Sequence, residues 1–248
     1  MEKIMDKELL GTNVLPIIAL RGKIAFPHVS MSFEVGRSIT LKAVERASAT
    51  TDRTLFICTQ KITEKDEITP DDLYQVGCVS KIKQISQLPG GIVRVSVEGL
   101  YRAKLRTWSF EEGCFHGVVD EMATVRGEEM WEDAYLRTAK ELVKDVLLNV
   151  GKITKEIYAK YEHVQDPDEY INCILAIMRV KTEIKQQILE ERRTIERLKH
   201  FEKCLNDELE ISKIEKKIST AVRKNIDKSQ KEYFLREQIK AIHAELGD

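Results

Sequence analysis

The fold is decided by Val79-Ser80-Lys81-Ile82-Lys83-Gln84-Ile85, followed by Leu88-Pro89-Gly90-Gly91 and then Val93-Arg94-Val95-Ser96-Val97-Glu98. In the last of these segments valine alternates with polar residues, which is typical of a strand with one buried face and one solvated face. Proline restricts φ, and glycine tolerates a positive φ, so Pro89-Gly90-Gly91 indicates a tight turn. The stretch therefore predicts a β-hairpin.

Two further strands are predicted on the N-terminal side of this hairpin. Leu55-Phe56-Ile57-Cys58 is a short apolar run of the kind found in buried strands. Val14 to Leu20 is the other candidate, and Pro16 within it favours an edge position because proline cannot donate to a ladder. Residues 38–49 between them have helical spacing. Together these elements predict a small, β-rich, partly barrel-like lobe over residues 1–123.

The composition becomes helical after this lobe. Apolar residues recur at helical spacing, and Asp166-Pro167 has the cap and first-turn residues of a helix start. The pattern predicts helices over residues 131–150, 154–163, from 166 onward, and 183–190. We therefore expect an α-helical bundle lobe over residues 124–193.

From Thr194 to Leu246 the chain contains neither proline nor glycine, which predicts one long helix within a third segment, residues 194–248. At ~1.5 Å per residue it would reach roughly 75 Å. Its apolar stripe changes phase between Leu209 and Ile211, so a sustained coiled coil is not predicted. We expect its start to pack on the helical lobe and its end to project or to meet another subunit. The apolar candidates for a tether or assembly contact are Tyr233, Phe234, Leu235, Ile239 and Ile242.

Composition narrows the function classes. The 248 residues are 42% hydrophobic and 33% charged, which fits an α+β chain with long solvated helices. The formal net charge of -1 gives no electrostatic reason to expect nucleic acid as the main partner. The five cysteines are scattered without C-x2-C spacing, so we expect reduced thiols and no zinc site. No run approaches the ~20 apolar residues of a membrane span, so an intracellular protein without a membrane partner is predicted.

Catalytic motifs are missing from this sequence. Gly22-Lys23 and Gly151-Lys152 lack the upstream glycine and following hydroxyl of a phosphate-binding loop, and G-x-S-x-G does not occur. Cys114-x-His116 could be half of a metal site, but a half-buried pair is the favoured interpretation. The adjacent acids Glu111-Glu112 indicate a turn with surface charge. We predict no catalytic, cofactor-binding or metal-binding residue in this chain.

Apolar residues at two predicted loop tips are candidates for contact with unfolded chains. These are Phe26-Pro27, between strands, and Leu88-Pro89, at the hairpin tip. The alternative is that they plug the core, which is favoured for Phe26 and balanced for Leu88. A basic stretch on the long helix offers weak nucleic-acid contact or, more simply, a solvated face. It comprises Lys213, Lys216, Lys217, Arg223, Lys224 and Lys228.

An ordered set of short motifs resembles the N-terminal region of Lon-type ATP-dependent proteases. The motifs are Val14-Leu15-Pro16, Phe26-Pro27-His28, Val35-Gly36-Arg37, residues 72–77, Leu88-Pro89-Gly90-Gly91, residues 97–103, residues 228–238 and Glu245-Leu246-Gly247. They extend over nearly the whole chain. Arg21-Gly22-Lys23 departs from the pattern, because it places a glycine where that family usually has none.

The resemblance implies a substrate-recognition and assembly module of an ATP-dependent Lon protease that degrades misfolded, damaged and short-lived regulatory proteins. Lon-type proteases are homo-hexameric serine endopeptidases, and a cytoplasmic location is expected. Their ATP and magnesium sites and their serine–lysine dyad lie C-terminal to the matched region, so none of those residues can be assigned here. The chain would then be a non-catalytic part of a longer protein, and by itself a monomer or weak dimer. The alternative is a stand-alone Lon-domain adaptor or nucleic-acid-binding protein.

Overall fold

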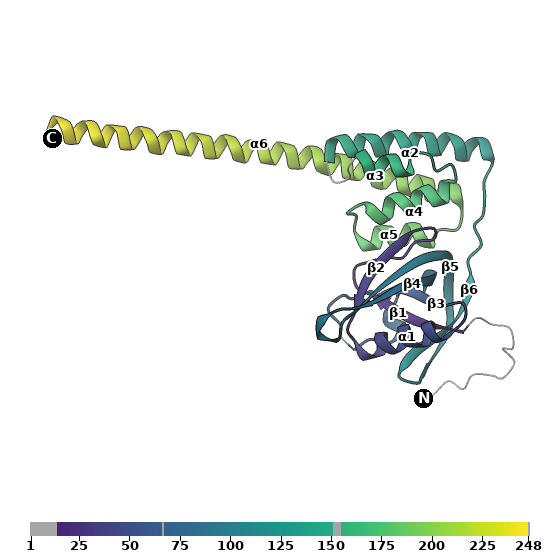
Figure 1. The fold of residues 1–248 in the computed structure, drawn as a ribbon. Coiled ribbons are helices and arrows are strands. Elements are labelled where there is room, and N and C mark those ends of the chain that lie inside the picture. Colours follow the sequence, from purple (N-terminus) through teal and green to yellow (C-terminus); the bar gives the residue numbers. More distant parts are fainter. Residues whose placement is uncertain (1–13, 66, 151–154, 248) are drawn as a thin grey trace.

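The computed structural model describes residues 14–65, 67–150 and 155–247, and it has the predicted α+β character. Figure 1 shows a lobe of strands at one end, a stack of helices on it, and one helix that projects far to the side.

The strand lobe is built from one strongly curved sheet. Its strands are β1 (Val14–Leu20), β2 (Ser30–Val35), β3 (Thr54–Thr59), β4 (Val76–Gln87), β5 (Val93–Glu111) and β6 (Cys114–Glu121). Their order is β2-β5-β4-β3-β1-β6, and β6 also pairs with β5. The pairings β5-β4-β3-β1-β6 therefore return to β5, while β2 pairs with β5 alone. This partly confirms the barrel-like prediction, since β2 lies outside the closed ring.

The predicted hairpin is confirmed as β4, a turn and β5. In the turn, Leu88 N donates to Ile92 O at 2.8 Å. Gly90 and Gly91 have φ values of 81° and 76°, which side chains with a Cβ rarely adopt. The turn therefore needs both glycines, and the strand pairing resumes directly at Gln87 and Val93.

The edge position predicted for β1 is wrong. β1 pairs with β3 on one side and with β6 on the other, so it lies within the ring. Its pairing with β6 ends at Pro16, and its pairing with β3 begins at Ile17. Pro16 is tolerated inside the sheet because it is the last residue of β1 that pairs with β6, directly before the pairing with β3 begins. The edge strand is β2.

The helix that follows β2 fills one side of the sheet. α1 (Ser38–Ala49) packs against β1, β3 and β6. Its buried residues Ala43, Val44 and Ala47 share a core cluster with strand residues such as Ile18 and Phe33. α1 thereby contributes apolar side chains to the core on this side of the sheet.

The predicted helices of the second lobe are confirmed. They are α2 (Glu129–Val150), α3 (Lys155–Tyr161), α4 (Pro167–Ile177), α5 (Thr182–Glu190) and the start of α6 (Thr194–Leu246). Asp166 caps α4 as predicted, since its carboxylate accepts a hydrogen bond from Glu169 N at 2.8 Å. The predicted helix stop at Gly151 lies outside the described residues.

The two lobes share one core. Phe26 and Val76 from the strand lobe belong to the same buried cluster as Ile171, Leu198 and Phe201 from the helices. Polar side chains add specific contacts across this junction. The buried Arg102 of β5 donates to Leu189 O at 3.1 Å and to Thr124 Oγ1 at 2.8 Å, and Gln186 Nε2 of α5 donates to Val76 O at 2.9 Å. The segment limits at residues 123 and 193 stay a prediction, although β6 ends at Glu121 and α2 begins at Glu129.

α6 has two halves with different surroundings. Its first turns bury Leu198, Phe201 and Leu205 against the helical lobe. From Lys213 to Gly247 every described residue is exposed, and Figure 1 shows this part extending away from both lobes. The prediction that the start packs and the end projects is confirmed.

Candidate functional site

Phe26 and Pro27 lie in the core and not on a surface. Phe26 is 2% exposed and packs between the lobes, and Pro27 O accepts a hydrogen bond from Asn172 Nδ2 at 3.4 Å. The loop is pressed against Gly99, where an added Cβ would lie 2.0 Å from Phe26 O. The core-plug alternative therefore fits both residues, and neither presents a side chain to a partner.

The tip of the β4–β5 hairpin does present apolar side chains. Leu88 is half-buried, Pro89 is exposed, and Ile92 is 38% exposed. Ile92 was not among the predicted contact residues, although its place directly after two glycines was an available signal. The tip is held firmly, because the ladder continues to Gln87 and Val93. It is thus a small, rigid apolar surface on an exposed loop, which suits contact with a partner.

A surface hollow of about 660 Å³ lies beside this tip. Ile92 lies next to Gly36, which is one of the residues that line the hollow. A Cβ added at Gly36 would be 3.9 Å from Ile92 Cγ1. The charged residues of the lining are Arg21, Lys23, Arg37, Arg94 and Glu34. Glu34 forms an ion pair with Arg94 at 2.7 Å. Because Glu34 is the one acid among the described residues of this lining, cationic side chains are in excess there. Sequence reasoning missed this hollow because its walls come from separate elements.

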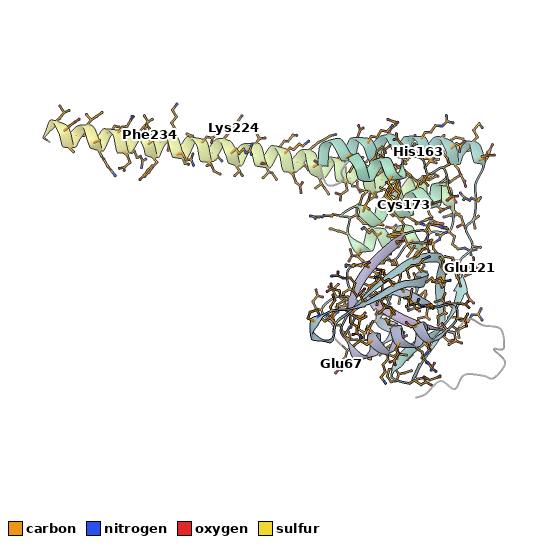
Figure 2. All side chains as sticks on the ribbon, in the orientation of Figure 1. Glu67, Glu121, His163, Cys173, Lys224 and Phe234 are labelled. Carbon is orange, nitrogen blue, oxygen red and sulfur yellow. The ribbon has the colours of Figure 1, made fainter. Side chains whose placement is uncertain are left out.

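The predicted assembly residues all lie on the projecting half of α6. Their exposed fractions are between 47% for Leu235 and 68% for Tyr233. Figure 2 shows Phe234 and Lys224 on this segment, well away from the folded lobes. A chain of exposed apolar residues precedes them, comprising Ile211, Ile214, Ile218, Val222 and Ile226. The structure thus leaves an apolar helical surface uncovered over many turns.

The basic residues of α6 are exposed along the same half of the helix. Lys228 lies 3.9 Å from Glu232, its i,i+4 neighbour. That spacing is typical of a solvated helix face. Both side chains of this pair are exposed, so the stretch is accessible to a polyanion as well.

In the part of the chain that the structure describes, no three His, Cys, Asp or Glu side chains come together as metal ligands. Cys114 Sγ lies 3.8 Å from His116 Nε2, without a third ligand. Glu112 lies in the β5–β6 turn, as predicted, and pairs with Arg46 at 2.6 Å. Among the described helices, none is long and apolar enough to cross a membrane.

The five thiols are free and buried, and Figure 2 shows Cys173 within the helical lobe. Burial raises the pKa of Cys78 and of Cys204 to about 12, and that of Cys173 to about 11. A thiol needs a lowered pKa to act as a nucleophile near neutral pH. These cysteines are therefore core residues and not reactive centres.

Comparisons with known proteins agree with this geometry. Residues 14–207 match the sequence model of the ATP-dependent protease La (LON) substrate-binding domain. A Lon protease of Clostridioides difficile is 38% identical over 240 residues, covering 94% of this chain and 30% of that protein. A Lon protease of Heliobacterium modesticaldum is 38% identical over 234 residues, covering 94% of this chain and 29% of that protein. The chain thus spans less than a third of the length of these relatives.

Solved structures show the same fold at low identity. The N-terminal domain of Mycobacterium avium complex Lon protease superposes with a TM-score of 0.67 at 20% identity, covering 79% of this chain and 99% of that one. A Lon N-terminal domain protein from Xanthomonas campestris gives a TM-score of 0.53 at 13% identity, covering 75% of this chain and 95% of that one. The match to the family sequence model ends at residue 207, close to where α6 leaves the helical lobe.

Proposed function

Because the chain belongs to the family of the ATP-dependent protease La (LON) substrate-binding domain, we propose that it is the substrate-recognition and assembly module of an ATP-dependent Lon protease. The observation that carries this proposal is the family match over both lobes, combined with the apolar hairpin tip beside them. Its substrates would be misfolded, damaged and short-lived regulatory proteins. The serine endopeptidase and ATPase chemistry, with ATP and magnesium, would belong to other parts of the protease. A cytoplasmic location stays a prediction.

The hairpin tip is the proposed contact for unfolded chains. Leu88, Pro89 and Ile92 form a small apolar surface, which by itself gives only weak affinity for the apolar segments that unfolded proteins expose. In a homo-hexamer, several copies of such a site act on one polypeptide, and effective concentration then raises the overall affinity. A weak individual site is therefore compatible with efficient capture.

α6 is the proposed tether. Its buried root fixes the direction of the helix relative to both lobes, while its projecting half exposes Tyr233, Phe234, Leu235, Ile239 and Ile242. Exposed apolar residues in such number indicate a surface that another chain or domain covers. We propose that this half connects the module to the ATPase and protease domains of the hexamer. The chain alone would be a monomer or a weak dimer.

A single substitution tests the hairpin tip. Leu88→Ser should weaken binding of a chemically unfolded, fluorescently labelled protein, because it removes apolar surface from the contact. The matched control is Ile62→Ser, since Ile62 is 55% exposed on a different loop of the same lobe. Fluorescence anisotropy would report both affinities. An unchanged affinity for Leu88→Ser would remove the tip from the site, and an equal loss for both variants would show that the effect is not local.

The second candidate function is a stand-alone Lon-domain adaptor or nucleic-acid-binding protein, favoured by the exposed basic stretch of α6. A nucleic-acid role predicts binding of an oligonucleotide that weakens steeply as salt is raised. Substitution of Lys217 and Lys224 by glutamine would then reduce the salt dependence. A coding sequence that continues into a G-x-x-x-x-G-K-[ST] motif would favour the protease over the adaptor.

A further inference from the structure

Strand β2 has an open edge that faces the hollow. Gly99 N donates to Val29 O at 3.0 Å, which sets the alternation of the β2–β5 ladder. By that alternation Phe33 and Val35 bond to β5, while the N–H and C=O groups of Ser32 and Glu34 point to the other side. Within the described ranges no backbone group pairs with them there.

The second half of β1 forms the opposite wall. Leu20 O accepts a hydrogen bond from Gln60 N, on the side of β3. Alternation then turns the carbonyl of Ala19 away from β3, and this carbonyl accepts a hydrogen bond from Arg37 Nη2 at 3.4 Å. Ala19 therefore faces the hollow, and an arginine side chain rather than a strand contacts this edge.

The hollow between these two walls has the size of a ligand site. Its volume of about 660 Å³ falls within the roughly 300–1,000 Å³ that is usual for ligand pockets. Its lining includes Ala19 and Leu20 of β1, Ser32 to Val35 of β2, Gly36 and Arg37 just before α1, and Thr40 in the first turn of α1. The main chain of β2 is thus accessible along several residues, which is the requirement for adding a strand.

The charges and the helix start favour an acidic occupant. Arg21, Lys23, Arg37 and Arg94 line the hollow against the single acid Glu34, and α1 has no acidic residue in its first turn. The hydroxyl of Thr40 lies at the same place. Thr40 is only 8% exposed, and it is one of the residues that line the hollow. A threonine hydroxyl can donate a hydrogen bond to an oxygen acceptor placed in the hollow.

We propose that this hollow binds an extended acidic segment of a substrate polypeptide as an additional β-strand along β2. The main chain of the segment would bond to Ser32 and Glu34, and its carboxylates would lie against Lys23, Arg37 and Arg94. The inference rests on the proposed substrate-recognition function and specifies one substrate class for it. The hairpin tip, which touches the rim through Ile92, would contact apolar residues next to the acidic segment.

The test uses the full chain and a fluorescein-labelled peptide of sequence TVEVEVT, followed by anisotropy. Two peptide controls separate the parts of the proposal: TVKVKVT inverts the charge, and a fully N-methylated TVEVEVT keeps the charge but cannot donate main-chain hydrogen bonds. The acidic peptide should bind. Both controls should bind about tenfold or more weakly, since each loses at least one to two hydrogen bonds or charge contacts. Equal binding of the N-methylated peptide would overturn the strand-addition proposal.

Two pairs of variants locate the site. Ser32→Pro removes an open-edge N–H at a position where proline is tolerated, and Ser32→Ala keeps that N–H as the control. Lys23→Glu reverses a charge in the hollow, and Lys104→Glu does so at an exposed position elsewhere on the lobe. Ser32→Pro and Lys23→Glu should each weaken TVEVEVT binding about tenfold, and their controls should not. If Ser32→Pro does not fold, the N-methylated peptide decides the question.

The outcomes distinguish this inference from the function on which it rests. A chain that binds unfolded protein but not TVEVEVT overturns the strand-addition site and leaves the proposed function standing. A chain that binds neither contradicts both. Binding of an oligodeoxythymidine that depends on Lys23, without peptide binding, would instead identify the hollow as a polyanion site and overturn the inference.

Discussion

The guanidinium of Arg197, on α6, is ion-paired with the carboxylate of Asp168, near the start of α4, and the Arg197 side chain is completely buried. Arg197 also donates to Ile188 O at 3.0 Å and to Asn172 Oδ1 at 2.8 Å. Thr194 Oγ1 donates to the other Asp168 oxygen at 2.8 Å. One buried arginine therefore joins α4, α5 and the root of α6. This network fixes the direction in which the long helix leaves the lobes.

Replacing Arg197 should destabilise the helical lobe strongly. Arg197→Met leaves the Asp168 carboxylate buried without its main partner, and loss of one member of a buried pair costs about 3–5 kcal/mol. Urea unfolding followed by circular dichroism measures this free energy. The control is Arg193→Met, which breaks an exposed pair with Glu191 and should cost less than about 1 kcal/mol. Equal losses would show that the buried network does not hold α6.

Gly99 should not tolerate even a methyl group. A Cβ there would lie 2.0 Å from Phe26 O and 3.0 Å from Cys78 Sγ, and neither the loop main chain nor the core can move aside easily. Gly99→Ala should therefore lower the free energy of unfolding by about 3 kcal/mol or prevent folding. At Gly36, the nearest atom would be Ile92 Cγ1 at 3.9 Å, so Gly36→Ala should change stability by no more than about 0.5 kcal/mol. A tolerated Gly99→Ala would contradict the close packing of the Phe26 loop.

The sequence predicts features that depend on neighbouring residues, but not features that depend on contacts between separate elements. The hairpin, the helix start at Asp166 and the limits of α6 depend on residues close together in the chain, and they were predicted correctly. The position of β1 depends on which strands pair with it, and a local rule about Pro16 therefore gave the wrong answer. Nothing in the sequence indicates that Arg197 forms a buried network, because its burial depends on contacts with α4 and α5. The hollow likewise exists only once β1, β2 and α1 are brought together.

The free energy of unfolding should fall in acid because specific carboxylates become protonated. Burial raises the pKa of Asp166, but hydrogen bonds from Glu169 N and Arg126 lower it more, so it lies below its usual value of 3.8. Hydrogen bonds from Arg193 hold the pKa of Glu191 at about 2. Since both values are depressed by folding, their contribution is present above the unfolded pKa values and is lost as pH falls through the folded ones.

The variants Asp166→Asn and Glu191→Gln should flatten this dependence. Asparagine still caps a helix, so Asp166→Asn removes the charge while retaining the N-terminal hydrogen bond of α4. The thermal midpoint, measured between about pH 5 and pH 2 where these groups titrate, should change less in each variant than in the unaltered chain. An unaltered slope in both variants would mean that other carboxylates govern acid unfolding.

The five thiols should not react with thiol reagents while the chain is folded. All are buried, and burial raises the pKa of each of them. Ellman's reagent should therefore react only at the rate at which the lobes open, and fully once denaturant is added. Mass spectrometry would count the modified residues. A thiol that reacts at once under native conditions would show that its part of the core is open in solution.

The central claim is that this chain recognises unfolded polypeptides, and the most direct measurement compares its affinity for one protein in two states. A stable protein and its chemically unfolded form, each labelled with the same fluorophore, would be titrated with the full chain under identical buffer and salt. We predict binding of the unfolded form and no measurable binding of the native form. Equal binding of both forms, or of neither, would contradict the account.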